Sequence, residues 1–127
     1  MIIAPITSAV AALAAVALVG LSVPISAQRF KAKVSLGHGR DKDLECRIRT
    51  QANFVEYTPM TLIVMGLAEA NGAPAAAVWA IAAAVVVGRA AHAFGMLSGA
   101  LHPRQLGILL TWVALLGAAG VLASRLV

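Results

Sequence analysis

The segment RIRTQANFVEYTP, residues 47–59, places charged and amide side chains at the start of a strongly apolar run. An α-helix turns about 100° per residue, so Arg49, Asn53 and Glu56 would share one face of a helix. Gln51 would point away from that face. Charged side chains at membrane depth are costly and normally have a partner. The pattern therefore predicts a polar site on a membrane helix.

The composition of the whole chain supports a membrane setting. Of its 127 residues, 61% are hydrophobic and 12% are charged. Soluble domains are nearer half apolar and a quarter charged. A chain of this length also lacks the interior volume to bury so much apolar surface in water. We therefore predict an integral membrane protein with a single domain over residues 1–127.

Long stretches with few or no charges mark the membrane segments. A helix needs roughly 20 apolar residues to cross the hydrocarbon core, and backbone groups in lipid must be satisfied within the segment. No stretch alternates as a membrane barrel strand would. The prediction is an all-α bundle of four transmembrane helices, at approximately residues 3–27, 44–69, 74–97 and 104–124.

The first apolar stretch has an alternative interpretation. The sequence VPISAQ, residues 23–28, resembles the small-residue cleavage site of a signal peptide. However, the segment lacks the basic n-region of such peptides and is long for one. We expect it to be retained as the first helix.

The basic residues predict an orientation. Seven of the ten lie in or beside the first connection, two flank the third, and none lies in the second: Arg29, Lys31, Lys33, Arg40, Lys42, Arg47, Arg49, Arg89, Arg104 and Arg125. The positive-inside rule then places both termini outside the cytoplasm. No aromatic residues interleave with a basic groove, so nucleic-acid binding is not expected. The N-terminus lacks a targeting peptide, which favours a bacterial inner membrane.

A second polar group lies in GRAAHAFGM, residues 88–96. Arg89, His92 and Met96 would share one helix face. Arg89 would be deep in the third helix and needs a partner, for which Glu56 is at comparable depth. Two interpretations remain open. The charges either only neutralise one another, as Arg49–Glu56 or Arg89–Glu56 pairs, or they also form a ligand site.

The segment RTQANFVEYTP resembles the Arg-x-x-x-Asn-x-x-Glu-Tyr-x-Pro signature of the MAPEG family, the membrane-associated proteins of eicosanoid and glutathione metabolism. ISAQRFKAKVS, residues 25–35, is similar to the end of the first helix in the leukotriene-synthase branch of that family. The resemblance implies a homotrimer of four-helix protomers. It also implies a glutathione site between adjacent protomers, open to the cytoplasmic side.

Carried over by residue, the resemblance implies substrate-binding roles for Arg29, Arg49, Gln51, Asn53, Glu56, Tyr57 and Arg89. His92 is added as the remaining polar residue of the third-helix face. The branch has tyrosines where this chain has His92 and Met96, so the cover over the bound tripeptide would differ. Arg104 falls near the family's thiol-activating arginine after a one-residue insertion, and it is the candidate catalytic residue. No metal site is expected.

These residue types suit glutathione, which carries two carboxylates, an ammonium group and a thiol. Arginine binds carboxylates through paired, charge-assisted hydrogen bonds. A nearby arginine also favours the thiolate, which is the reactive form. We expect conjugation of glutathione to a lipophilic small molecule that arrives from the bilayer. A small four-helix transporter and a non-catalytic membrane scaffold are the alternatives.

Overall fold

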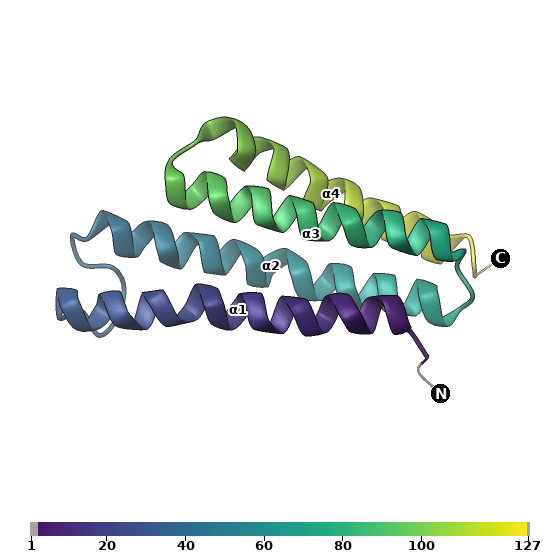
Figure 1. The fold of residues 1–127 in the computed structure, drawn as a ribbon, viewed down its shortest axis with the longest axis horizontal. Coiled ribbons are helices and arrows are strands. Elements are labelled where there is room, and N and C mark those ends of the chain that lie inside the picture. Colours follow the sequence, from purple (N-terminus) through teal and green to yellow (C-terminus); the bar gives the residue numbers. More distant parts are fainter. Residues whose placement is uncertain (1–2, 127) are drawn as a thin grey trace.

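A computed structural model of the chain describes residues 3–126. Residues 1, 2 and 127 of the predicted domain lie outside the described residues. Four helices follow one another: α1 (Pro5–Ala32), α2 (Lys42–Ala70), α3 (Ala75–Ser98) and α4 (Leu101–Ala123). Figure 1 shows them as long, roughly antiparallel rods, with both chain ends beside the turn between α2 and α3. The predicted all-α class and the order of its four helices are confirmed.

The helix limits differ from the predicted ones mainly in two places. α1 continues to Ala32, five residues further than expected, and it ends where Lys33 adopts the left-handed conformation at φ 55°. α4 begins at Leu101 rather than near residue 104. Pro103 is tolerated there because the N–H groups of a helix's first turn have no intrahelical acceptor.

Three of the helices, α1, α3 and α4, are long and apolar enough to cross a membrane. α2 is not among the helices that meet this test of length and composition. Its 29 residues still extend roughly 43 Å. α2 begins near the end of α1, lies antiparallel to it and leads to the beginning of α3. If α1 and α3 cross the membrane, α2 must therefore cross it as well. The chain is therefore a four-helix integral membrane protein with one polar helix.

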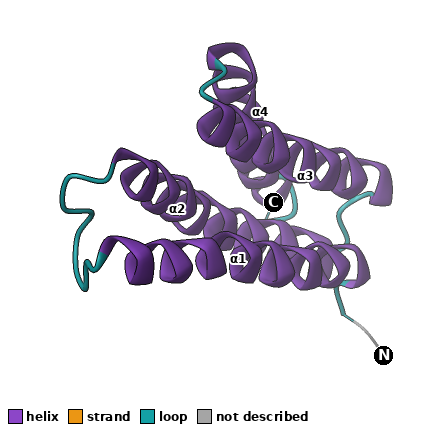
Figure 2. Cartoon of the chain, turned by 60° about the vertical axis from the view of Figure 1, so that its left-hand side comes forward, coloured by secondary structure: helices purple, strands orange, loops and turns teal. Residues whose placement is uncertain are grey.

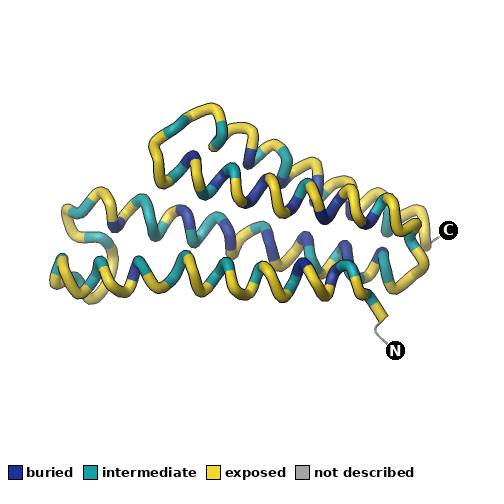
Figure 3. The backbone as a smooth tube through the Cα atoms, viewed as in Figure 1, coloured by how far each residue is buried: buried dark blue, intermediate teal, exposed yellow. Residues whose placement is uncertain are grey.

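The helices are arranged around α2, which contacts each of the other three. Figure 2 shows α1 and α2 side by side, with the α3–α4 pair packed against them. The largest buried side chains of the apolar core come from α2 and α3, including Met65, Val78 and Val85. Figure 3 shows α1 mostly exposed along its length. Much of α1 is therefore available for lipid or for another protein.

Glycines hold α3 and α4 close together. A Cβ on Gly107 would collide with the backbone of His92, and a Cβ on Gly95 would collide with the backbone of Arg104. Small residues allow such close backbone approach between membrane helices, where no hydrophobic effect drives association. These contacts fix how far α4 is displaced along the axis of α3, and so they position His92 and Arg104 relative to one another.

Carboxylates secure two helix N-termini. The Asp41 carboxylate accepts the Leu44 N–H at 3.0 Å and so caps α2. It also accepts a hydrogen bond of 2.8 Å from the side chain of Gln28, near the end of α1. The Leu44 N–H, and then Gln28, hold the pKa of Asp41 below its ordinary value. This loop is thereby tied to both helices that it joins.

The N-terminus of α1 is capped from another helix. Glu69, at the end of α2, accepts the backbone N–H groups of Ile6 and Thr7 at 2.9 and 2.8 Å. It also accepts the Thr7 hydroxyl at 2.7 Å. α1 has no capping side chain of its own. Glu69 therefore satisfies N–H groups that would otherwise have no acceptor in the membrane interface.

Candidate functional site

Arg89 lies at the centre of a polar network inside the bundle. Its side chain is 6% exposed. One terminal nitrogen, Nη2, donates to Asn53 Oδ1 on α2 at 2.7 Å and lies 3.2 Å from His92 Nδ1. The other, Nη1, donates to Thr111 Oγ1 on α4 at 3.2 Å. A single guanidinium thus joins α2, α3 and α4 at membrane depth.

The network contains no counter-ion for Arg89 within one protomer. All five acidic residues of the chain lie among residues 3–126, and the ion pairs formed there are Arg47–Asp43 and His38–Glu45. The expected Arg89–Glu56 pair is not formed. Asn53 takes the place of the carboxylate, because it lies on the side of α2 that faces α3. A buried cation partnered by neutral groups is costly, which makes this position a candidate for function.

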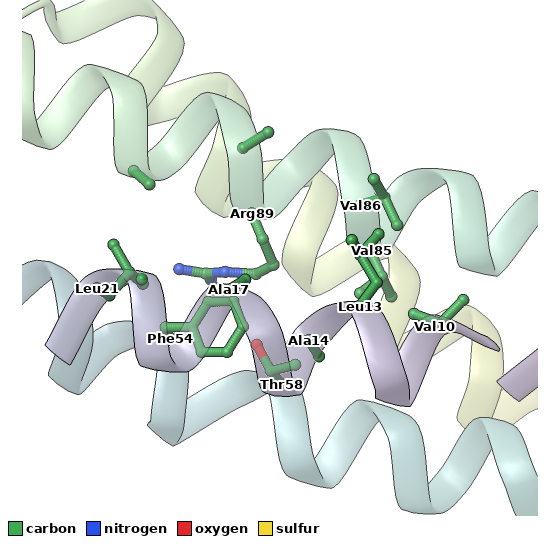
Figure 4. Close-up of a pocket in the computed structure, with 13 residues that line it drawn as sticks. Val10, Leu13, Ala14, Ala17, Leu21, Phe54, Thr58, Val85, Val86 and Arg89 are labelled. Atoms are coloured by element: carbon green, nitrogen blue, oxygen red, sulfur yellow. The ribbon is translucent and has the colours of Figure 1, made fainter. Parts of the chain in front are cut away.

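The guanidinium of Arg89 also lies near an aromatic ring and has one hydrogen-bond donor without a partner. Its carbon lies 5.7 Å from the centre of the Phe54 ring, a distance at which a cation is attracted by an aromatic face. Its Nε atom is buried and has no hydrogen-bond partner, and the same is true of the Thr58 hydroxyl. Both groups line a cavity of about 310 Å³ between α1, α2 and α3 (Figure 4).

Arg49 and Glu56 lie on a different side of α2. Both are exposed, and neither takes part in an ion pair within residues 3–126. The Arg49–Glu56 bridge of the first of the two interpretations is therefore not formed. Met60 and Ile63, 53% and 58% exposed, share this face with them. We call the group formed by Arg49, Glu56, Met60 and Ile63 the open face of α2.

Gln51 and Tyr57 lie outside the open face: Gln51 is on the opposite side of α2, toward α1, and Tyr57 is about 80° around the helix from Arg49. Gln51 donates to the Ser22 hydroxyl on α1 at 3.2 Å. Tyr57 is half-buried, and its backbone carbonyl accepts the Thr61 hydroxyl at 2.9 Å. Within one protomer Gln51 is thus part of the α1–α2 contact. Its substrate-binding role, which the family resemblance implies, remains a prediction.

Arg29 and Arg104 lie near the same end of the bundle as Arg49. Arg29 donates from Nη1 to the carbonyl of Gly37 at 2.7 Å and to that of Ser35 at 3.3 Å, and so closes the loop that follows α1. Arg104 is exposed in the first turn of α4, with its backbone fixed against Gly95. The predicted site residues thus form two groups: a buried network around Arg89, and exposed groups on the open face and at this end.

Two participants were missed in the sequence. Thr111 is the only polar residue in GILLTWVALL, residues 107–116, and a hydroxyl isolated in an apolar span is a signal that could have pointed to it. Thr58 lies on the side of α2 opposite the open face, where the motif gave no reason to look. Both are buried and lie beside Arg89 in space.

The fold and the site define an integral membrane protein of four helices, with an arginine-centred network in its interior. The chain belongs to the MAPEG family, whose family model matches residues 7–124. It is similar to the inner membrane protein YecN of Escherichia coli K12, with 32% identity over 106 residues. The match covers 84% of this chain and 81% of that protein. YecN of Escherichia coli O6:H1 matches equally well.

Proposed function

We propose that the protein is a glutathione-binding membrane enzyme of the transferase type, acting as a homotrimer in a bacterial inner membrane. The observation that carries the proposal is the open face of α2. Arg49 and Glu56 are exposed there, beside exposed Met60 and Ile63. The similarity to an inner membrane protein supports the location.

The open face requires a cover. A charged side chain facing lipid is strongly unfavourable, and intramembrane charges normally face a bundle interior or an aqueous cavity. A second copy of the chain can supply that cover, since Met60 and Ile63 offer apolar contact around the charges. The site would then be shared between copies, and the homotrimer expected for the family would create three such sites.

Glutathione matches the charges gathered there. Arg49 is suited to one of its carboxylates, and Glu56 is suited to its ammonium group. Arg29 lies at the same end and is suited to the second carboxylate once its loop contacts adjust. With both termini outside, these groups would open toward the cytoplasm. Asn53 and Tyr57 flank the site from the same helix and would orient the peptide.

Arg104 is the proposed thiol activator. A free thiol has a pKa of about 8.5, and an adjacent cation favours the thiolate by about 1–3 units. The sulfur would attack an electrophilic carbon of a lipophilic substrate, forming a C–S bond while the leaving group departs with the bonding pair. The position of Arg104 at the end of the bundle, where lipid meets water, suits a reaction between a soluble thiol and a membrane-dissolved partner.

The test is conjugation of glutathione to 1-chloro-2,4-dinitrobenzene by purified protein in detergent. We expect a rate above the uncatalysed one, and Arg104→Ala should lose at least about 90% of it. Arg125→Ala is the matched control, because Arg125 is exposed and follows the C-terminal end of α4, whereas Arg104 lies in its first turn. A scaffold or a transporter would give no conjugation, and equal rates for the two variants would remove Arg104 from the mechanism.

A further inference from the structure

A basic hollow lies at the end of α1, where the connection to α2 begins. Its volume is about 410 Å³, and it is lined by Arg29, Phe30, Lys33, Val34 and Ser35. Figure 2 shows this connection projecting beyond the ends of both helices. α1 carries no charged residue before Arg29, so the hollow begins where the helix leaves the apolar layer. The hollow is therefore at the depth of the lipid headgroups.

The cations of this region outnumber the carboxylates that could neutralise them. Residues 29–49 contain seven basic and three acidic residues. Each acidic side chain already has a partner: Asp41 accepts from Leu44 and Gln28, Asp43 pairs with Arg47, and Glu45 lies 4.0 Å from His38. Lys33 is exposed and takes part in no ion pair within residues 3–126. The hollow thus carries positive charge that the protomer does not neutralise, which suits an anion.

The backbone of the connection positions both cations of the hollow. Arg29 Nη1 donates to the carbonyls of Ser35 and Gly37, at 3.3 and 2.7 Å, so Nη2 takes no part in these contacts. Lys33 ends α1 in the left-handed conformation, at φ 55°. Glycine is favoured at such a position, because a side chain there costs conformational energy. A lysine in this place favours a role for its ammonium group.

An exposed apolar stripe of α1 leads to the hollow. Phe30, Val23, Val19 and Val16 are spaced by seven, four and three residues, so they share one face of the helix. Their exposed fractions are 87, 60, 61 and 71%. The stripe extends roughly 21 Å from the hollow toward the middle of the membrane. A lipid with its phosphate in the hollow would therefore have an apolar surface for an acyl chain directly below it.

We infer that the hollow binds the phosphate of an anionic phospholipid, with an acyl chain along Phe30 and Val23. Ammonium and guanidinium groups both bind phosphate, and arginine does so through paired hydrogen bonds. Clusters of basic residues next to a membrane helix attract anionic headgroups, whereas the cation of a zwitterionic headgroup would add to the positive charge already present. The inference does not depend on the glutathione site, because Lys33 and Phe30 have no part in that site.

The experiment measures binding of single lipids to delipidated full-length protein in detergent by native mass spectrometry, without glutathione. Phosphatidylglycerol is compared with phosphatidylcholine of the same acyl chains. We expect phosphatidylglycerol to bind at least about fivefold more tightly, because one cation near an anionic headgroup contributes about this factor. Glycerophosphoglycerol, which has the same headgroup without acyl chains, should not displace it at equal concentration. Equal affinity for the two lipids, or displacement by the soluble headgroup, would overturn the inference.

Lys33→Gly tests the hollow without weakening the fold. Glycine adopts the left-handed conformation more readily than lysine, so the end of α1 is retained while the charge is lost. The preference for phosphatidylglycerol should fall about fivefold. Lys42→Gln is the matched control, because Lys42 is exposed at the beginning of α2 and does not line the hollow. Equal losses in the two variants would show diffuse attraction to the surface charge and would overturn the site.

Phe30→Ala tests the apolar stripe. It should weaken binding of both lipids alike, because an apolar contact does not distinguish their headgroups. Phe94→Ala is the control, since Phe94 is an exposed phenylalanine of α3 and should leave both affinities unchanged. Unchanged binding to Phe30→Ala would contradict the placement of the acyl chain. So would a Phe30→Ala protein in which only the oligomer mass changes, since the stripe would then be a contact between copies.

Discussion

Arg89 on α3 donates a hydrogen bond of 2.7 Å to the side-chain oxygen of Asn53 on α2. The two residues belong to different motifs of the sequence and lie 36 positions apart. Their contact means that the amide of the second-helix motif is used inside the protomer, while Arg49 and Glu56 of the same motif face outward. One helix therefore serves the interior of the bundle and its open face at once.

The Arg89–Asn53 contact predicts a large effect of a small substitution. Asn53→Ala leaves a buried guanidinium nitrogen without its shortest acceptor, which should lower the free energy of unfolding by about 1–3 kcal/mol. Thermal unfolding in detergent measures the change. Asn71→Ala removes an exposed amide on the same helix's C-cap and should change stability by less than about 0.5 kcal/mol. Equal effects of the two variants would show that Arg89 does not depend on Asn53.

Because α3 packs closely on α4, replacing two different glycines of α4 by alanine should change the stability of the protein in different ways. Gly107→Ala forces a methyl group into the His92 backbone and should destabilise the protein by about 1–3 kcal/mol. Gly120→Ala meets no atom within 4 Å and should be neutral or stabilising by up to about 1 kcal/mol. Thermal midpoints of both variants check this. A Gly107→Ala protein as stable as Gly120→Ala would contradict the packing described.

The cap that Glu69 places on α1 should be visible at single amides. In Glu69→Ala the N–H groups of Ile6 and Thr7 lose their acceptors, and the loss of a helix cap costs about 0.5–2 kcal/mol. Hydrogen exchange at these two amides should become faster, while exchange in the middle of α1 stays slow. Glu69→Gln retains one carbonyl acceptor and should give an intermediate rate. Unchanged exchange in Glu69→Ala would show that the cap is not formed.

Asp41 predicts a pH dependence of stability. Because the pKa of its carboxyl is lowered by the Leu44 N–H and Gln28, the ionised form stabilises the folded state. This contribution is complete at neutral pH and is lost as the pH falls below about 4. Asp41→Ala should therefore lower the thermal midpoint at pH 7, and the difference from wild type should shrink at pH 3. A difference of equal size at both pH values would rule out the carboxylate as its source.

The helices were predictable because lipid restricts the backbone to few solutions. Stretches of about 20 residues with few or no charges gave all four helices in order. The predicted ends were wrong by up to five residues, at the point where α1 continues into a polar segment. No hydropathy signal marks that extension, since α1 leaves the apolar core before it ends at Lys33. The Glu69 cap was equally hidden, because it joins residues more than 60 positions apart.

The candidate site was predictable only in part. Helical spacing correctly placed Arg49 and Glu56 on one face, but the pairing of either Arg49 or Arg89 with Glu56 was wrong. Which side of α2 meets α3 depends on the packing of whole helices, and small rotations decide whether an amide or a carboxylate reaches the arginine. Thr58 was missed for the same reason, since only the packed bundle brings its hydroxyl beside Arg89.

The central claim is that the open face of α2 binds glutathione. Its most direct test is an isothermal calorimetric titration of glutathione into the purified protein. The open face predicts saturable binding, weakened at least tenfold in Arg49→Gln and unchanged in Arg40→Gln, whose side chain is exposed in the loop before α2. Absence of saturable binding at millimolar glutathione, or equal binding to both variants, would contradict the account.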